Sequence, residues 1–160
     1  MEKDFLQKMG YAGLTSRIKR INDALLYSTR DFYKAQNLDI EPNWHMVILL
    51  LKEKGPLSNS QIAEEIQLSH PAVVRMINQM KVKNYVNAKD DEKDSRRTLL
   101  ELSEKALTEM PALEKCWNAC VETMKEITKN KELIFEVLSD IEYQLEEGDY
   151  KTRTENNLKT

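Results

Sequence analysis

The chain has 160 residues, of which 41% are hydrophobic and 32% charged, and this composition is that of one water-soluble domain with a charged surface. The presence of only four glycines and four prolines favours helices over sheets or repeats. The sequence contains no long apolar run and begins with charged residues, which argues against a membrane-spanning segment and a secretory signal peptide. We therefore expect a mainly helical protein of the cytoplasm.

The net charge of −3 is distributed unevenly along the sequence. Residues 1–36 contain seven basic and four acidic residues, residues 37–100 contain nine of each, and residues 101–150 contain five basic and thirteen acidic residues. The basic residues of the middle segment cluster between Arg75 and Arg97. A nucleic acid would therefore bind at the middle segment, with a strong dependence on salt, and the acidic C-terminal part would face away from it.

Two helices are predicted before residue 55. Apolar residues recur three or four positions apart from Leu14 to Phe32, which predicts a long amphipathic helix that ends near residue 37. Pro42 suits the first turn of the next helix, which Gly55 and Pro56 end.

Residues 57–83 have the pattern of a helix-turn-helix. Ser58 followed by Gln61 is a capping-box pattern, and Ser69 is a second N-cap candidate, with Pro71 in the first turn of its helix. Arg and Asn side chains can read guanine and adenine edges in the major groove. The apolar positions of the second helix fall at helical spacing, so its opposite side presents Pro71, Arg75, Asn78 and Val82, flanked by His70, Val74 and Gln79. A plain helical hairpin is the alternative interpretation.

A charged hairpin is predicted after this second helix. Asn84 can end the helix, and residues 85–88 and 96–102 are typical of two short strands joined by a charged turn. The turn, taken alone, is most simply a solvated hairpin tip. Together with the helix-turn-helix, the hairpin predicts a winged helix-turn-helix over residues 42–102.

Two further amphipathic helices are predicted after the hairpin. Ser103 can cap the first, in which Pro111 should cause a bend or an interruption, and residues 129–131 separate it from the second. From residue 148 to residue 160 a polar, mobile tail is expected. The helices at 12–37 and 103–147 carry more apolar surface than one small module covers, which favours dimerisation helices in a homodimer over a monomer whose helices wrap their own domain.

The segment from Leu57 to Leu102 resembles the DNA-binding core of the MarR family of bacterial regulators. In that core a helix-turn-helix is followed by a Gly-Leu-Ile/Val pattern, a wing with two Asp residues three apart and an Arg two further, and a closing Leu-Thr. The corresponding residues here are Asn84-Tyr85-Val86, Asp91, Asp94, Arg96 and Leu102-Ser103. The resemblance covers about residues 12–147 and implies a single domain over residues 1–147.

A second motif is similar to one subgroup of this family. Glu41-Pro42-Asn43-Trp44 resembles the opening of the helix before the helix-turn-helix in regulators that are often fused to an acetyltransferase domain. Because the sequence ends soon after the regulator segment, we expect no acetyltransferase here.

The resemblance also implies roles for residues of the wing. Arg96 would enter the minor groove, Asp91 and Asp94 would hold the wing in shape, and Lys89 would contact the DNA backbone, since Ala88 stands where many members have a basic residue. Residues at the start of a helix also tend to hydrogen-bond phosphate. The candidate DNA-binding residues are thus Ser58, Asn59, Ser60, Ser69, His70, Pro71, Val74, Arg75, Asn78, Lys89 and Arg96.

Effectors in this family often bind near the helix that precedes the helix-turn-helix. A pocket for a small aromatic effector would draw on Tyr27, Trp44, His45 and Trp117, although core packing is the simpler interpretation of both tryptophans. Cys116 and Cys120 lie four apart on one predicted helix and are expected to be reduced apolar residues, with a redox or soft-metal role as the alternative.

The two histidines lie in different elements, and the sequence contains no metal-ligand spacing or catalytic motif. We therefore expect no metal, no cofactor and no enzyme. The prediction is a homodimeric, sequence-specific DNA-binding transcription regulator, a repressor by family habit, which binds a pseudo-palindromic operator and is relieved by a small effector. The alternative, motivated by the acidic C-terminal part, is a protein-interaction module that keeps the fold without specific DNA binding.

Overall fold

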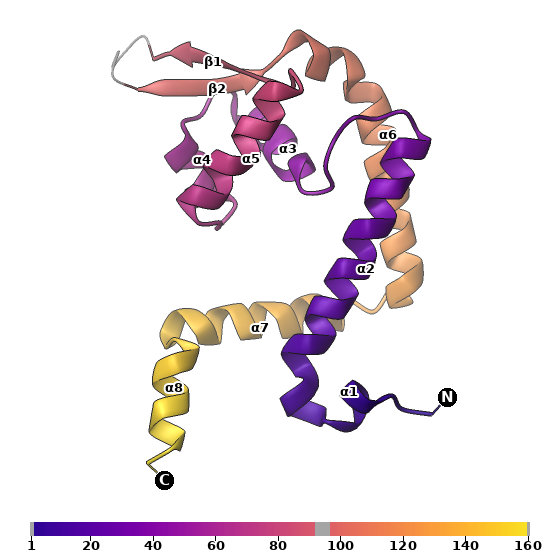
Figure 1. Ribbon diagram of the computed structural model, residues 1–160, viewed down its shortest axis with the longest axis vertical. Helices are drawn as coiled ribbons and strands as arrows, with labels where there is room; N and C mark the ends of the chain where they lie inside the picture. Colours follow the sequence, from indigo (N-terminus) through magenta and orange to yellow (C-terminus); the bar gives the residue numbers. More distant parts are fainter. Residues whose placement is uncertain (1, 92–96, 160) are drawn as a thin grey trace. The chain divides into compact units, whose positions relative to one another are not determined.

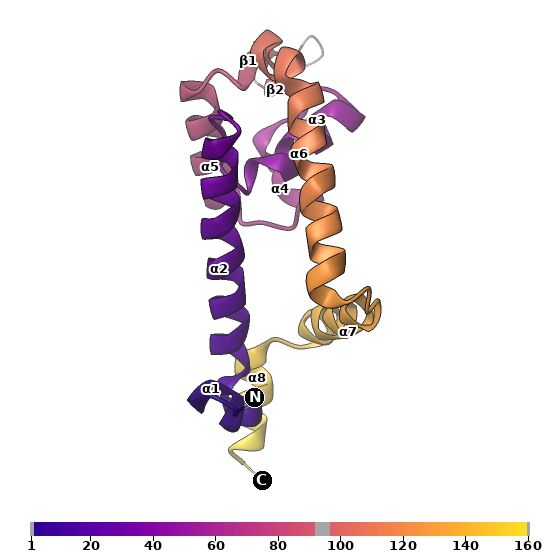
Figure 2. The same ribbon diagram turned by 90° about the vertical axis from the view of Figure 1, so that its right-hand side faces the viewer.

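The computed structural model describes residues 2–91 and 97–159, and Figures 1 and 2 show its helices and strands. The chain divides into two compact units, Met1–Leu113 and Glu114–Thr160, each of which is described by itself. The described residues are mostly helical, with one small antiparallel sheet in the first unit. The predicted fold class, mainly α-helical with a small β-wing, is confirmed. No helix among the described residues is long and apolar enough to cross a bilayer.

The first unit opens with the helical segments α1 (Phe5–Lys8), η1 (Gly10–Gly13) and α2 (Leu14–Ala35). α2 confirms the predicted long helix, whereas the sequence patterns above do not predict α1 or η1. A capping box begins α1, because Asp4 accepts the backbone N–H of Gln7 and the Gln7 side chain accepts that of Asp4. Arg20 of α2 forms an ion pair with Asp4 at 2.8 Å, which ties α1 to α2.

The helix-turn-helix is preceded by one helix, and the three are α3 (Trp44–Lys54), α4 (Asn59–Glu65) and α5 (His70–Val82). The capping box predicted at Ser58 is confirmed, since the Gln61 N–H donates to the Ser58 hydroxyl oxygen at 3.3 Å. Asn84, predicted to end α5, has a φ of 59° in the left-handed region, which asparagine tolerates.

The start of α3 differs from the prediction. α3 begins at Trp44, so Pro42 precedes the helix and does not lie in its first turn. The backbone N–H of Trp44 donates to the Glu41 carbonyl at 3.0 Å, which places Pro42 at the first central position of a turn. Proline favours this position because its ring already holds the φ angle that the turn needs.

The wing is the antiparallel pair β1 (Val86–Asp90) and β2 (Thr98–Leu102). Leu57, in the connection between α3 and α4, adds a bridge to this sheet. Its N–H donates to the Leu100 carbonyl at 3.1 Å and its carbonyl accepts the Leu100 N–H at 2.8 Å. These two bonds join the wing to the helix-turn-helix, and the sequence patterns do not predict them.

The long helix α6 (Glu104–Thr128) begins in the first unit. As predicted, Ser103 caps it, because the Ser103 hydroxyl oxygen accepts the N–H of Ala106 at 3.1 Å. The sequence predicts a bend or an interruption at Pro111. The helix is continuous through this residue, so it is not interrupted there. Pro111 and Leu107 are both exposed, and the Leu107 carbonyl that proline leaves unpaired can be hydrated there.

The core of the first unit lies between α3, α4, α5, the wing and the first turns of α6. Burying one large aliphatic side chain of this kind contributes about 1.5–3 kcal/mol. The most deeply buried side chains are Val47, Ile48, Ile62, Val73, Ile77, Met80, Tyr85, Leu100, Ala106 and Leu113. Because α5 supplies three of them, the core holds one side of this helix in place.

The second unit contains the remainder of α6, α7 (Leu133–Glu147) and α8 (Tyr150–Asn157). Lys129 and Asn130, with φ angles of 54° and 53°, end α6 where the sequence predicts a break. The segment expected to be a polar tail contains the helix α8, which the sequence does not predict. Its mobility and the single-domain division at residue 147 stay predictions.

Two side chains hold the ends of α7 and α8. Asp149 caps α8 by accepting the backbone N–H of Thr152 at 2.9 Å, and this hydrogen bond lowers the pKa of the Asp149 carboxyl. The Arg153 guanidinium donates to the Gln144 carbonyl at 2.6 Å and the Gly148 carbonyl at 2.8 Å. The last carbonyl groups of α7 therefore find donors in α8.

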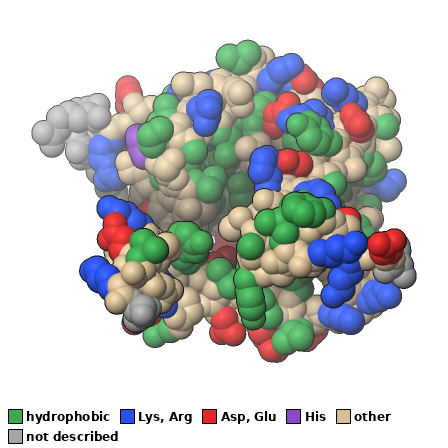
Figure 3. All heavy atoms as spheres, turned by 60° about the horizontal axis from the view of Figure 1, so that its bottom comes forward, with side chains coloured by type: hydrophobic (Ala, Val, Ile, Leu, Met, Phe, Trp, Pro, Cys, Tyr) green, Lys and Arg blue, Asp and Glu red, His purple; other side chains and the backbone are tan. Residues whose placement is uncertain are grey.

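Apolar side chains are exposed in both units, and Figure 3 shows such side chains among charged ones on one face of the chain. In α2, Leu14, Ile18 and Ile21 are 40–55% exposed. The exposed set of α7 is Leu133, Ile134, Phe135, Val137, Leu138, Ile141, Tyr143 and Leu145. Exposed apolar surface of this kind is typical of an interaction surface.

Candidate nucleic-acid interface

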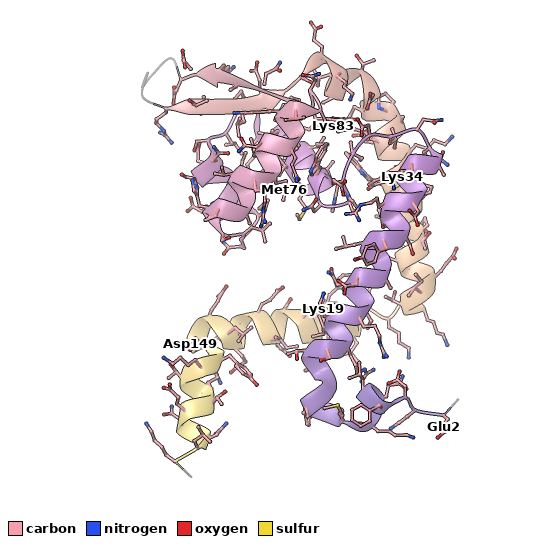
Figure 4. All side chains as sticks on the ribbon, in the orientation of Figure 1. Glu2, Lys19, Lys34, Met76, Lys83 and Asp149 are labelled. Atoms are coloured by element: carbon pink, nitrogen blue, oxygen red, sulfur yellow. The ribbon has the colours of Figure 1, made fainter. Side chains whose placement is uncertain are left out.

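α5 separates a buried apolar side from an exposed polar side, as predicted. Figure 4 labels Met76 on this helix, and the buried side consists of Val73, Met76, Ile77 and Met80. The exposed side presents Pro71, Arg75, Asn78 and Val82, while Val74 is half-buried between the two. An α-helix fits the major groove, and a guanidinium and a carboxamide one turn apart can reach base edges there.

The start of α5 is exposed as well. Ser69 is the N-cap residue, as predicted, but its side chain makes no capping hydrogen bond. His70 is the first residue of the helix and is exposed. The Ser69 hydroxyl is not used by the cap and the His70 side chain is exposed, so contact of either with a DNA phosphate stays a prediction.

Ser58, Asn59 and Ser60 lie at the start of α4. The Ser58 hydroxyl oxygen accepts the Gln61 N–H in the capping box, and Asn59 is half-buried. Ser60 is exposed. Of these three candidates, Ser58 thus serves the fold of α4 directly, and Ser60 is the most accessible to a phosphate.

A cavity of about 700 Å³ lies between α5 and the segment that leads into α3. Two of its carboxylates are already paired, Asp39 with Lys83 at 2.9 Å and Glu41 with Arg30 at 2.8 Å. Arg75 also lines the cavity and forms no ion pair with any described residue. The full lining is Asp39, Ile40, Glu41, Trp44, Pro71, Val74, Arg75, Asn78, Gln79, Val82 and Lys83. The candidate base-reading residues therefore form one wall of a hollow in which Lys83 is paired with Asp39 and Arg75 supplies a positive charge that forms no ion pair with a described residue.

Of the aromatic residues predicted to form an effector pocket, Trp44 lines this cavity and is 2% exposed. Tyr27 is 64% exposed, with the Arg30 guanidinium 5.9 Å from its ring centroid. His45 Nδ1 lies 2.8 Å from the Pro42 carbonyl oxygen, and Trp117 belongs to the second unit. The effector pocket stays a prediction, and Trp44 is the one member of the set that this cavity contains.

The wing brings an unpredicted acidic side chain next to a predicted basic one. Lys89 Nζ lies 2.8 Å from Glu101 Oε2 on the neighbouring strand, so a carboxylate partly neutralises the expected phosphate contact. The backbone N–H of Asp91 donates to the Arg97 carbonyl at 3.0 Å, which continues the hairpin beyond the strands. Asp94 and Arg96 lie outside the described residues.

The contact between Lys89 and Glu101 has a measurable consequence for DNA affinity. We expect Glu101→Gln to raise the affinity for DNA a few-fold at low salt, because the Glu101 carboxylate no longer offsets the charge of Lys89. A new phosphate contact would also steepen the dependence of log K on log salt by about 0.9. Stability should change little, since exposed ion pairs contribute about 0–1 kcal/mol.

Titration of one duplex at several salt concentrations measures this effect. Glu122→Gln is the matched control, because it removes one carboxylate from the exposed Glu122–Lys125 pair of α6. An equal change of the salt slope in both variants would mean that net charge, not Lys89, is responsible.

Comparison with known proteins shows which sequences and structures this chain resembles. Residues 38–97 match the model of the MarR family, and no curated protein matches the chain. Overoxidised AbfR bound to DNA is similar with 16% identity and a TM-score of 0.68, over 88% of this chain and 96% of that chain. The E. coli MarR variant bound to operator DNA has 18% identity and a TM-score of 0.63, over 91% and 98% of the two chains.

The PcaV regulator from Streptomyces coelicolor, in complex with its natural ligand, has 14% identity and a TM-score of 0.66, over 88% of this chain and 96% of that chain. At these identities the likeness shows a shared fold. The MarR-family match covers the winged-helix segment, and the fold that the chain shares with these structures extends over most of its length.

Proposed function

We propose that the chain is a sequence-specific DNA-binding transcription regulator. The observation that carries the proposal is the division of α5, which buries Val73, Met76, Ile77 and Met80 and exposes Arg75 and Asn78 on the opposite side. The DNA-bound structures of AbfR and MarR, which share this fold, support it. In this proposal α5 enters the major groove and the wing lies along the neighbouring minor groove.

The regulator acts as a homodimer on a pseudo-palindromic operator. The exposed apolar residues of α2 and α7 support this part of the proposal, because a second copy of the chain would remove them from water. Two symmetric copies of α5 would then read half-sites about ten base pairs apart. Repression is the direction of control that we propose.

A small planar aromatic anion relieves the repression. The cavity beside α5 supports this step, since it combines the apolar wall of Trp44, Val74 and Val82 with the charge of Arg75. An occupant of this cavity would compete with DNA for Arg75 and Asn78 directly.

Selection of binding sites from a random duplex pool tests the proposal. We expect enrichment of a pseudo-palindrome with half-sites about ten base pairs apart. Placed in a promoter, the selected site should lower transcription when the protein is present, and a salicylate-like compound should restore it. Failure of a folded dimer to enrich any sequence, at low as well as moderate salt, would contradict the DNA-binding function.

A protein-interaction module is the second candidate, and the ion pairs around the interface favour it. Lys54, Lys83 and Lys89 are each paired with a carboxylate, which reduces the positive charge that DNA would meet. Salt separates the two candidates. A DNA-binding protein loses affinity for duplexes steeply between low and physiological salt, whereas an interaction module shows no specific duplex binding at either.

A further inference from the structure

The short segment that follows the recognition helix α5 is bound tightly to the first turns of α6. The Ser103 hydroxyl donates to the Asn84 carbonyl, and the Ser103 N–H donates to the Tyr85 carbonyl at 3.1 Å. The Lys105 ammonium donates to the Lys83 carbonyl at 3.0 Å. Three consecutive backbone carbonyls after α5 are therefore held by two residues at the start of α6.

The side chain of Tyr85 makes the deepest of these contacts. It is 0% exposed, and its hydroxyl donates to Glu109 Oε2 one turn further along α6. The Lys105 ammonium lies 4.2 Å from the centroid of its ring, and the ring of Trp44 packs edge-on at 5.6 Å. One aromatic side chain thus contacts α6 at two points and α3 at a third.

The hydroxyl remains a donor throughout the physiological pH range. Burial, and then the Glu109 carboxylate, raise the pKa of Tyr85 well above its usual value. A hydrogen bond from a neutral donor to a carboxylate is shorter and stronger than one between neutral groups.

Tyrosine is not required at this position by packing alone. The Asn84-Tyr85-Val86 segment stands where the family pattern has Gly-Leu-Ile/Val, so Tyr85 occupies a leucine position. A leucine can fill an apolar space, but it cannot donate to Glu109 or present a ring face to Lys105. This chain therefore adds a polar connection between the end of α5 and α6.

We infer that Tyr85, through Glu109 and Lys105, is a positioning residue that sets the orientation of the recognition helix on α6 and thereby the half-site spacing that the regulator accepts. The inference rests on the proposed function. Tyr85 is not offered as a DNA contact, because it is wholly buried. It acts at the C-terminal end of α5, where a small rotation would displace Arg75 and Asn78 relative to the same residues of a second copy.

Two measurements separate positioning from a general loss of structure. The first is the spacing profile, obtained by selection from duplexes with two copies of the enriched half-site and a variable number of base pairs between them. The second is the affinity for a duplex with a single half-site. Loss of folded protein lowers the binding to every spacing and to the single half-site by the same factor. Loss of positioning instead broadens the spacing profile and leaves the bases preferred within a half-site unchanged.

Tyr85→Phe removes the hydroxyl and retains the ring. We expect the preference for the best spacing over its neighbours to fall roughly tenfold, with single half-site affinity within about twofold of the parent. Glu109→Ala, at a half-buried position, should reproduce this result from the other partner. Tyr150→Phe is the control, because Tyr150 is 73% exposed in α8, and it should leave the profile unchanged.

An unchanged spacing profile in folded Tyr85→Phe or folded Glu109→Ala would overturn the inference, even if the affinity falls. Should Tyr85→Phe fail to fold, Glu109→Ala decides alone. Failure of the parent protein to select any half-site is a different outcome, because it overturns the proposed function and this inference with it.

Discussion

Replacement of Arg75 by alanine is expected to remove most of the sequence preference at one base pair of each half-site. An arginine that donates two hydrogen bonds to a guanine contributes about 1–3 kcal/mol of discrimination. Because Arg75 is exposed and lies in the middle of α5, alanine should preserve the helix and the core. In a symmetric dimer the substitution acts twice, so affinity for the full operator should fall by about 2–6 kcal/mol.

Arg75→Lys is the matched variant for this prediction. Lysine keeps the charge but loses the planar pair of donors, so we expect it to retain part of the affinity and little of the base preference. Selected-site profiles of the parent and both variants measure this directly. If Arg75→Ala lowers affinity equally for every sequence, Arg75 contacts phosphate and another part of α5 reads the bases.

The reading helix could be predicted from the sequence because its signals are local. The Ser58–Gln61 capping box, the left-handed Asn84 and the buried period of α5 each depend on residues that lie within a few positions of one another. Signals of this kind can be recognised from a short stretch of sequence, without knowledge of the rest of the fold. The same reasoning explains why the sequence predicts Pro42 inside α3, whereas the residue lies in the turn just before the helix. Proline suits a turn as well as a helix start.

The contacts that place the helix could not be predicted in this way. Tyr85 and Glu109 are 24 positions apart, and a tyrosine in an apolar run looks like any other core residue until its hydroxyl finds a partner. The bridge between Leu57 and Leu100 joins the connection between α3 and α4 to the middle of β2, and the sequence carries no periodic signal for this pairing. The pairing of Lys89 with Glu101 had a weak signal, since Lys89 directly follows the first predicted strand and Glu101 lies in the second, so their opposite charges can meet once the register is known.

The helices α1 and α8 show a third case, in which the signal was present but weak. α1 begins with Asp4 and Gln7 in a capping box, and α8 begins with Asp149 as its N-cap. Both helices bury no residue, so neither carries an apolar period that would identify it. The ion pair with Arg20 stabilises α1, and the bonds from Arg153 to α7 stabilise α8. The local sequence pattern does not include these partners.

Replacing the exposed isoleucines of α2 is expected to weaken the dimer strongly. Ile18 is 49% and Ile21 55% exposed, so each has about half of its surface left to bury against a second copy. That surface corresponds to roughly 1 kcal/mol per residue, and twofold symmetry counts every substitution twice. Replacing both by glutamate should therefore weaken the dimer by about 4 kcal/mol from apolar burial alone, close to a thousandfold in its dissociation constant.

Sedimentation measures the dimer, and duplex binding reports what its loss does to recognition. The double variant should keep its fold, because neither isoleucine belongs to the buried core, and should bind a single half-site as the parent does. Its advantage for the full palindrome should disappear, since that advantage comes from linking two reading helices.

Ser16→Glu, at an exposed position two residues before Ile18, places the same charge on the same helix and should leave the dimer intact. A double variant that remains dimeric would assign the interface to the apolar residues of α7 instead, and the same substitution at Leu138 would then be the one that separates the two copies.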